Sequence, residues 1–103
     1  MKNKGIKEEE KIARELGGIP TPRSGGGSIK GDVFATLNGT KYSIQSKYTD
    51  NNSFTLKLSD LDKSIEEGLI HGRETIFIIT FKNRRFWVLS EYQAKQLIEG
   101  EGE

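Results

Sequence analysis

The sequence has no cysteine and a single histidine among its 103 residues. The chain therefore forms no disulfide and no thiolate metal site, and a zinc site would lack its usual ligands. No apolar run approaches the ~18 residues that a membrane-spanning helix needs. The N-terminal stretch MKNKGIKEEE lacks the apolar segment of a signal peptide, so we expect an intracellular, cytoplasmic location.

A strong charge of one sign is also missing, because the formal net charge is +1. A total near zero neither favours nor excludes nucleic acid as a partner, since a local basic patch decides such binding. Hydrophobic residues make up 33% of the chain, which is typical of a small globular domain with a modest core. We expect one domain over residues 1–98 and an acidic, glycine-rich flexible tail over residues 99–103.

Apolar periodicity and turn residues predict an α/β (α+β) domain in the order α-β-β-β-α-β-β-α, with a central mixed five-stranded sheet flanked by helices. The pair Asn38-Gly39 predicts a tight turn between the first two strands, and Gly17-Gly18 predicts a C-terminal cap for the first helix. The prolines of IPTP, residues 19–22, favour extended chain. The expected helices cover about 4–16, 60–71 and 91–99, and the expected strands about 32–37, 41–48, 53–58, 75–81 and 85–89.

The second half of the chain carries further local signals. Ser59 with Asp62 predicts the N-cap of the second helix, and Ser90 with Gln93 predicts that of the last helix. The nearly continuous apolar strand 75–81 should be central and covered on both faces. The second helix should bury an apolar ridge that consists of Leu61, Ile65 and Leu69.

Some side chains that could take part in catalysis or binding have ordinary structural interpretations. The single histidine, His71, stands beside Gly72, and we expect a role at a helix end rather than in catalysis. The basic segment 82–85, KNRR, is expected to be a solvated hairpin tip rather than a contact site. The aromatic residues Phe86, Trp87 and Tyr92 are expected to belong to the core.

A carboxylate lies in the middle of the apolar stripe of the first helix. On a helical wheel at about 100° per residue, Glu9 occupies the centre of an arc of roughly 120°. A carboxylate in such a place is costly unless a partner compensates its charge. The alternative is that Glu9 lies at the edge of the core and extends to solvent. The apolar members of the arc are Ile6, Ile12, Ala13 and Leu16.

The strand 41–48 adds a second group of polar side chains. Alternation places Lys41, Ser43, Gln45 and Lys47 on one face, and Tyr42, Ile44, Ser46 and Tyr48 on the other. Asp32 begins the adjoining strand, so a helix packed on this sheet could bring Glu9 to the same place. Mg²⁺ prefers oxygen ligands, and Mn²⁺ is expected to substitute for it. The expected ligands are Glu9, Asp32, Gln45 and the backbone carbonyl of Ser46, and Lys47 would orient a water or stabilise developing charge.

Four segments in order resemble motifs of the PD-(D/E)XK nuclease superfamily. They are KGIKEE at 4–9, RSGGGS at 23–28, GDV at 31–33 and IQSK at 44–47. The chain is most similar to the small archaeal-type Holliday-junction resolvases, which also occur in phages. The resemblance implies a restriction-endonuclease-like fold, Mg²⁺-dependent hydrolysis of branched DNA in recombination and repair, and a homodimer that presents two active sites to a four-way junction. Glu9, Asp32, Gln45 and Lys47 would be its catalytic residues.

Two positions depart from the family pattern. Gly31 stands in place of the proline, which only shapes the chain. Gln45 stands in place of an acidic residue, and it keeps an oxygen donor without the charge. Glu9 and Asp32 would then carry all the negative charge of the site. Weaker metal binding, or an inactive nuclease that only binds DNA, is the alternative interpretation.

Basic and hydroxyl side chains near the expected site suit contacts with DNA phosphates, which set affinity but read no bases. They are Arg23, Ser24, Ser28, Lys30 and Lys41. The segment 23–28 could instead be an ordinary linker, and it is not a Walker-type loop because no GK[ST] follows. The alternatives for the whole protein are another nuclease of the same fold acting on flaps, ends or duplex, a non-catalytic nucleic-acid-binding module, and a structural domain.

Overall fold

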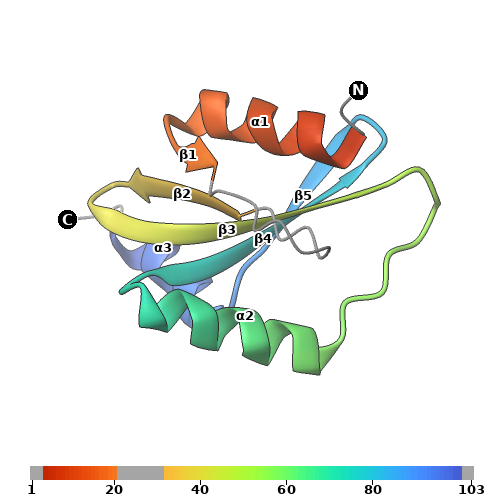
Figure 1. The fold of residues 1–103 in the computed structure, drawn as a ribbon. Helices are drawn as coiled ribbons and strands as arrows, with labels where there is room; N and C mark the ends of the chain where they lie inside the picture. Colours follow the sequence, from red (N-terminus) through yellow and green to blue (C-terminus); the bar gives the residue numbers. More distant parts are fainter. Residues whose placement is uncertain (1–3, 21–31, 101–103) are drawn as a thin grey trace.

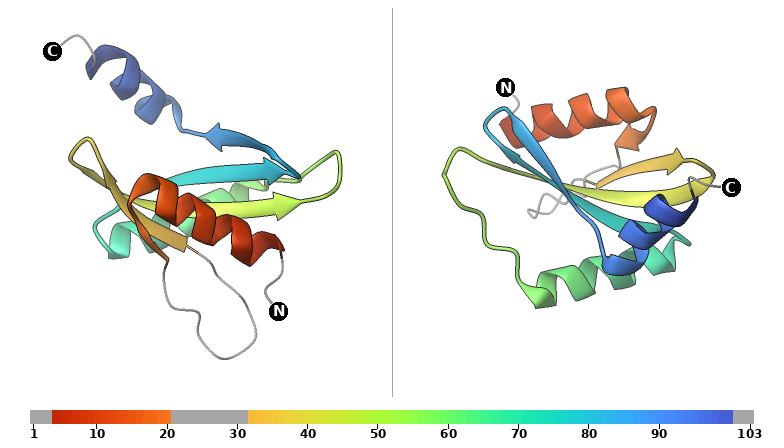
Figure 2. Two further views of the ribbon diagram at one scale, coloured as in Figure 1. Left: turned by 90° about the horizontal axis from the view of Figure 1, so that it is seen from above. Right: turned by 180° about the vertical axis from the view of Figure 1, so that it is seen from behind.

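The computed structural model describes residues 4–20 and 32–100 of the chain. Its elements are α1 (Lys4–Leu16), β1 (Ile19–Pro20), β2 (Asp32–Leu37), β3 (Thr40–Thr49), α2 (Leu58–Ile70), β4 (Glu74–Phe81), β5 (Arg84–Val88) and α3 (Glu91–Gly100). Helices α1 and α2 cover opposite faces of one twisted sheet, and α3 lies beyond β5 (Figures 1 and 2). The predicted α+β class and element order are confirmed.

The sheet has five strands in the spatial order β1-β2-β3-β4-β5. Strands β3 and β4 pair in parallel, and every other neighbouring pair is antiparallel, so the sheet is mixed. A parallel pair needs a crossover connection, which α2 supplies. Strand β4 lies between β3 and β5 with its central residues buried, as the apolar run 75–81 predicts.

The third strand expected from the sequence, 53–58, is wrong. Residues 53–57 have no regular structure, and Leu58 already begins α2. Strand β3 has β2 on one side and β4 on the other, so this segment has no place beside β3 and instead leads into the crossover. The additional strand is β1, a two-residue piece at the sheet edge, where Pro20 is tolerated because an edge strand can dispense with one amide donor.

The glycine signals at two chain reversals are confirmed. Asn38 and Gly39 have φ values of 52° and 82° in the turn between β2 and β3, which is the left-handed region that such a tight turn requires. Gly17 has φ of 67° just after α1, and the amide of Gly18 donates to the carbonyl of Ala13 at 2.8 Å. Both features end an element at the residue that the sequence indicates.

The two predicted N-caps have different outcomes. The amide of Ser90 donates to Oε1 of Gln93 at 3.0 Å, and the amide of Gln93 donates to Oγ of Ser90 at 3.1 Å, so the capping box of α3 is confirmed. The cap at Ser59 is wrong, because α2 begins at Leu58. Lys57 occupies the N-cap position in an extended conformation, without a side-chain capping bond among the described residues.

The main core lies between α1 and the sheet. We call this side of the sheet the α1 face, and register pairing puts Val33, Ile44, Ile76 and Ile78 on it. Its fully buried cluster also contains Ile12 and Ala13, so the predicted inward stripe of α1 is confirmed. The opposite side, the α2 face, carries the alternate residues of the same strands.

Helix α2 does not bury the predicted ridge. Ile65 is 44% exposed and Leu69 is 66% exposed. The helix contacts β4 through its small residues instead: the hydroxyl of Thr75 donates to the carbonyl of Ser64 at 3.0 Å, and Gly68 lies so close that a Cβ there would meet Oγ1 of Thr75 at 2.5 Å. This contact rotates the apolar ridge of α2 partly outward.

The aromatic residues near the C-terminus are not core residues. Phe86, Trp87 and Tyr92 are 45%, 44% and 64% exposed, because β5 is an edge strand and α3 does not cover it. Helix α3 continues through Glu99 and Gly100, the first two residues of the predicted tail, and the rest of that tail lies outside the described residues. None of the described helices has both the length and the apolar character of a membrane span.

Candidate metal site at the start of strand β2

Glu9 is buried, with 3% of its surface exposed. It lies on the side of α1 that also buries Ile12 and Ala13 against the sheet. The alternative in which Glu9 extends to solvent is therefore wrong. A carboxylate that gives up its hydration at a helix–sheet interface requires compensation from hydrogen bonds or positive charge.

The level of Glu9 along the sheet follows from its neighbours on α1. Oε2 of Glu8 accepts a hydrogen bond from the hydroxyl of Thr80 at 3.1 Å. One turn further along the helix, Ile12 belongs to the same buried cluster as Ile44. Helix α1 thus runs antiparallel to β3, and Glu9 lies between these two contacts.

These contacts place Glu9 over the middle of β3. Thr80 is the register partner of Tyr48, and Ile44 lies on β3 itself, so the residue between the two levels on the α1 face is Ser46. Glu9 therefore lies above the segment that carries Gln45 and Lys47. That segment, at 45–47, is the one that the sequence predicts to form the site.

Strand β2 begins at this same level. Asp32 is the register partner of Gln45, and Gln45 is 8% exposed. Strand β3 continues past Gln45 to Thr49, so within the described ranges its edge is without a β2 partner from residue 46 onward. The backbone thus brings the start of β2, the middle of β3 and the sheet side of α1 to one corner of the sheet (Figure 1).

The side chains approach this corner from two sides. Gln45 and Lys47 alternate with Ile44 and therefore point to the α2 face, whereas Glu9 approaches from the α1 face. Glu9 can meet them only around the edge of β3 next to Asp32. The convergence of Glu9, Asp32 and Gln45 on one cation, with Lys47 beside it, stays a prediction, because only the backbone of Asp32 is described.

The donor types at this corner fit a hard divalent cation. A buried carboxylate from Glu9 and the amide oxygen of Gln45 are oxygen donors of the kind that Mg²⁺ prefers. The hydroxyl of Ser46 is a buried polar atom without a hydrogen-bond partner in the described part of the chain. Among the described residues, no three or more His, Asp and Glu side chains form a group that could hold a metal ion. The predicted ligand set has only two carboxylates, so it would not produce such a group.

The predicted DNA-contacting residues are only partly described. Arg23, Ser24, Ser28 and Lys30 lie outside the described residues, as does Gly31. Lys41 is exposed on the α2 face, near the turn between β2 and β3. It lies four residues before Gln45, which is roughly 13 Å along an extended strand. Lys41 is therefore at the opposite end of β3 from the corner.

Arg85 is a residue that the sequence interpretation missed. It was expected to be solvated at a hairpin tip, but Nε donates to Oε2 of Glu8 and Nη1 donates to Oε1 of Glu15, both at 2.5 Å. Glu8 and Glu15 are seven residues apart on α1 and so share one side of the helix. The seven-residue spacing of these two glutamates was the sequence signal that could have indicated a shared basic partner on a strand. Hydrogen bonding to Arg85 lowers the pKa of Glu15.

A second polar cluster holds the N-terminal end of α1. Nζ of Lys4 lies 3.2 Å from Oδ2 of Asp50, and the hydroxyl of Tyr48 donates to Oδ1 of Asp50 at 2.8 Å. The hydrogen bond from Tyr48, and then that from Lys4, lowers the pKa of Asp50. Together with Arg85 these contacts fix the rotation of α1, which directs Glu9 toward β3.

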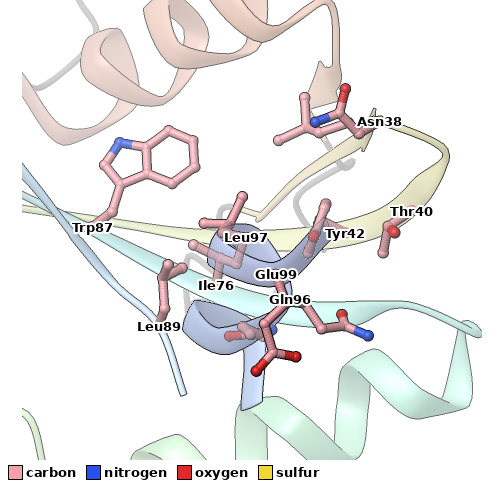
Figure 3. Close-up of a pocket in the computed structure, with 11 residues that line it drawn as sticks. Asn38, Thr40, Tyr42, Ile76, Trp87, Leu89, Gln96, Leu97 and Glu99 are labelled. Atoms are coloured by element: carbon pink, nitrogen blue, oxygen red, sulfur yellow. The ribbon is translucent and has the colours of Figure 1, made fainter. Parts of the chain in front are cut away.

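A separate hollow of about 810 Å³ lies among β4, β5, α3 and the turn between β2 and β3. Apolar side chains from β4, β5 and α3 point into it, as Figure 3 shows for Ile76, Trp87, Leu89 and Leu97. Asn38 and Tyr42 bound it at the turn end of β3, away from residues 45–47. This hollow has both polar and apolar lining residues, and Glu9, Gln45, Ser46 and Lys47 do not line it.

Comparison with known proteins adds no family assignment. No protein-family model matches the chain, and no curated protein matches it. The likeness to PD-(D/E)XK nucleases therefore stays a prediction that rests on the sequence motifs.

We predict that Arg85→Met destabilises the fold by roughly 1–3 kcal/mol near pH 7, because it removes charge-assisted bonds to α1. Arg85 lowers the pKa of Glu15, so this contact stabilises the folded state above the ordinary value of 4.5 and is lost as the pH falls through the folded-state pKa. Urea unfolding of both proteins from pH 7 to pH 3 measures the difference, which should shrink below about pH 4.5.

Arg84→Met is the matched control. Arg84 is exposed and stacks over the ring of Phe86, with 5.2 Å from its guanidinium carbon to the ring centroid. Its replacement should cost less than that of Arg85 and show no such pH dependence. Equal losses for the two variants would show that the ion pairs do not hold α1.

Proposed function

We propose that the protein is a Mg²⁺-dependent DNA endonuclease that cleaves branched DNA, most specifically a Holliday-junction resolvase. The observation that carries the proposal is the burial of Glu9 over residues 45–47, where β2 begins. A buried helix carboxylate beside Asp32 and a Gln45–Lys47 pair is the arrangement that the sequence motifs imply. The confirmed α+β fold supports the same interpretation.

Each residue at the corner has a role in this proposal. Glu9, Asp32, Gln45 and the carbonyl of Ser46 would hold the cation, which when bound supplies charge stabilisation and an acidified water. Lys47, half-exposed beside Gln45, would orient the attacking water and stabilise the charge that develops on the phosphate. Hydrolysis would proceed by in-line attack on a phosphodiester.

The neutral side chain of Gln45 limits the charge available to the cation. Glu9 and Asp32 together contribute two negative charges, and an amide oxygen adds a weaker donor. We therefore expect a modest affinity for Mg²⁺, with the phosphate of bound DNA completing the site. Mn²⁺ should substitute for Mg²⁺ because it accepts the same oxygen donors.

The residues proposed to bind DNA are Arg23, Ser24, Ser28, Lys30 and Lys41. Their contacts would be to phosphates and would therefore weaken as salt increases. The exposed position of Lys41, roughly 13 Å from Gln45, suits a contact to the duplex beyond the cleaved bond. A DNA substrate also places the protein inside the cell, in the cytoplasm.

Gln45 favours one further candidate, a non-catalytic nucleic-acid-binding module on the same fold. Loss of one carboxylate from a metal site lowers its charge, which suits binding without cleavage. Another nuclease of this fold, acting on flaps, ends or duplex, uses the same corner and differs only in substrate.

We predict that the protein cuts four-way junctions symmetrically in the presence of Mg²⁺ and is inactive with chelator. Asp32→Asn and Lys47→Ala should each reduce the cleavage rate by at least about 100-fold, since one removes a ligand charge and the other a charge-stabilising group. Lys63→Ala, at an exposed position of α2, is the control and should retain full activity. Rates on labelled junction, flap and duplex DNA measure these effects.

The same experiment separates the alternatives. Mg²⁺-independent binding without cutting would identify the inert module, and preferential cutting of flaps, ends or duplex would identify a different nuclease. Absence of both binding and cutting would leave a structural domain. Full activity of Asp32→Asn or Lys47→Ala would remove the proposed site from the mechanism.

Symmetric cutting of a junction needs two active sites, so we propose a two-fold homodimer. We assign its interface to the α3 surface, defined by Trp87, Tyr92, Leu97 and Ile98. These side chains are 44%, 64%, 51% and 76% exposed, and Trp87 and Leu97 line the hollow of Figure 3. Trp87 lies on β5, two strands from β3, and the other three side chains belong to α3, so the surface does not include the start of β2.

We predict by light scattering a mass twice that of the 11.6 kDa chain. Leu97→Glu should produce a monomer, because it buries a charge in the proposed interface. Leu69→Glu, on the exposed ridge of α2, should remain dimeric. The reverse result would move the interface to α2, and a monomeric parent protein would contradict the dimer altogether.

A further inference from the structure

We infer that Ser46 is a further binding residue of the proposed cation site, where its hydroxyl holds a cation-bound water together with Glu9. This inference rests on the proposed function. It concerns the side chain of Ser46, which lies on the opposite face of β3 from Gln45 and Lys47. The backbone carbonyl of the same residue is a separate group.

The hydroxyl of Ser46 is buried and has no hydrogen-bond partner among residues 4–20 and 32–100. A hydroxyl that loses its hydrogen bonds to water on burial and gains no other partner destabilises the folded state. An alanine would fill nearly the same space without that cost. Buried polar groups are satisfied by protein, water or a ligand in the great majority of cases. Ser46 therefore indicates a polar ligand at this point.

The surroundings of the hydroxyl match a hydrated cation. Glu9 is 3% exposed and lies at the level of Ser46 on the same face, so a carboxylate and a hydroxyl share one buried region. A water placed there has the two to four polar partners that a buried water requires.

The donor and acceptor pattern is also consistent. A cation-bound water donates hydrogen bonds through both of its hydrogens. A serine hydroxyl can accept one of these bonds while it donates a hydrogen bond of its own to a carboxylate. Mg²⁺ retains several waters when proteins bind it. Ser46 would thus orient one water of the shell on the Glu9 side, while Lys47 acts on the α2 face.

Ser43 provides a matched control on the same strand. It is 2% exposed, but it lies on the α2 face and three residues before Ser46. Ser43→Ala therefore makes the same chemical change on the opposite side of the sheet, at a residue that is more buried than Ser46. A general effect of altering β3 would appear in both variants.

The test is calorimetric titration of Mn²⁺ into the full chain and into Ser46→Ala and Ser43→Ala. Groups that orient metal-bound ligands typically change metal affinity by 10–100-fold, so Ser46→Ala should weaken Mn²⁺ binding by about 10-fold or more. Ser43→Ala should remain within about twofold of the parent, because its hydroxyl faces away from Glu9. In chelator, Ser46→Ala should unfold at the same or a higher urea concentration than the parent.

The outcomes separate this inference from the proposed function. Unchanged Mn²⁺ affinity of Ser46→Ala, in a parent protein that binds Mn²⁺ and cleaves DNA, would overturn the role of Ser46 and leave the nuclease proposal standing. Equal weakening by both serine variants would also overturn it. A parent protein that binds no Mn²⁺ would contradict the proposed function and this inference together.

Discussion

The burial of one carboxylate is the constraint on which the functional interpretation depends. Glu9 occupies the sheet-facing side of α1, where an apolar residue would pack at no electrostatic cost. Desolvating a carboxylate is unfavourable by several kcal/mol on a typical scale, unless nearby positive charge or hydrogen bonds offset it. A divalent cation at the start of β2 would supply that charge. In this view, Glu9 is buried because it belongs to a site.

The position of Glu9 depends in turn on how α1 is held. Arg85 of β5 donates hydrogen bonds to Glu8 and Glu15, and Lys4 at the N-terminal end of the helix forms an ion pair with Asp50. These charged contacts lie on both sides of Glu9 along α1, and the apolar cluster around Ile12 adds the packing. A helix anchored on both sides has little freedom to rotate, so the level of Glu9 over β3 is well determined.

Local patterns predicted much of the fold and the place of Glu9 in the apolar stripe of α1, because they depend on neighbours in sequence. The helix 4–16, the Asn38-Gly39 turn and the apolar strand 75–81 are of this kind. The errors involve partners far along the chain. Residues 53–58 alternate like a strand but find no free edge, and the ridge at Ile65 and Leu69 turns outward because Gly68 lets α2 approach β4 through another side. The pairing of Arg85 with α1 spans about 70 residues, beyond the reach of local patterns.

The central claim is that one cation joins Glu9, Asp32 and Gln45 although they approach from both faces of the sheet. Anomalous diffraction from crystals grown with Mn²⁺ tests it most directly. The account predicts a single strong peak at about 2.1 Å from oxygen atoms of these three side chains, next to the edge of β3. A peak that excludes Glu9, or a Glu9 carboxylate neutralised by a protein cation with no metal nearby, would contradict it.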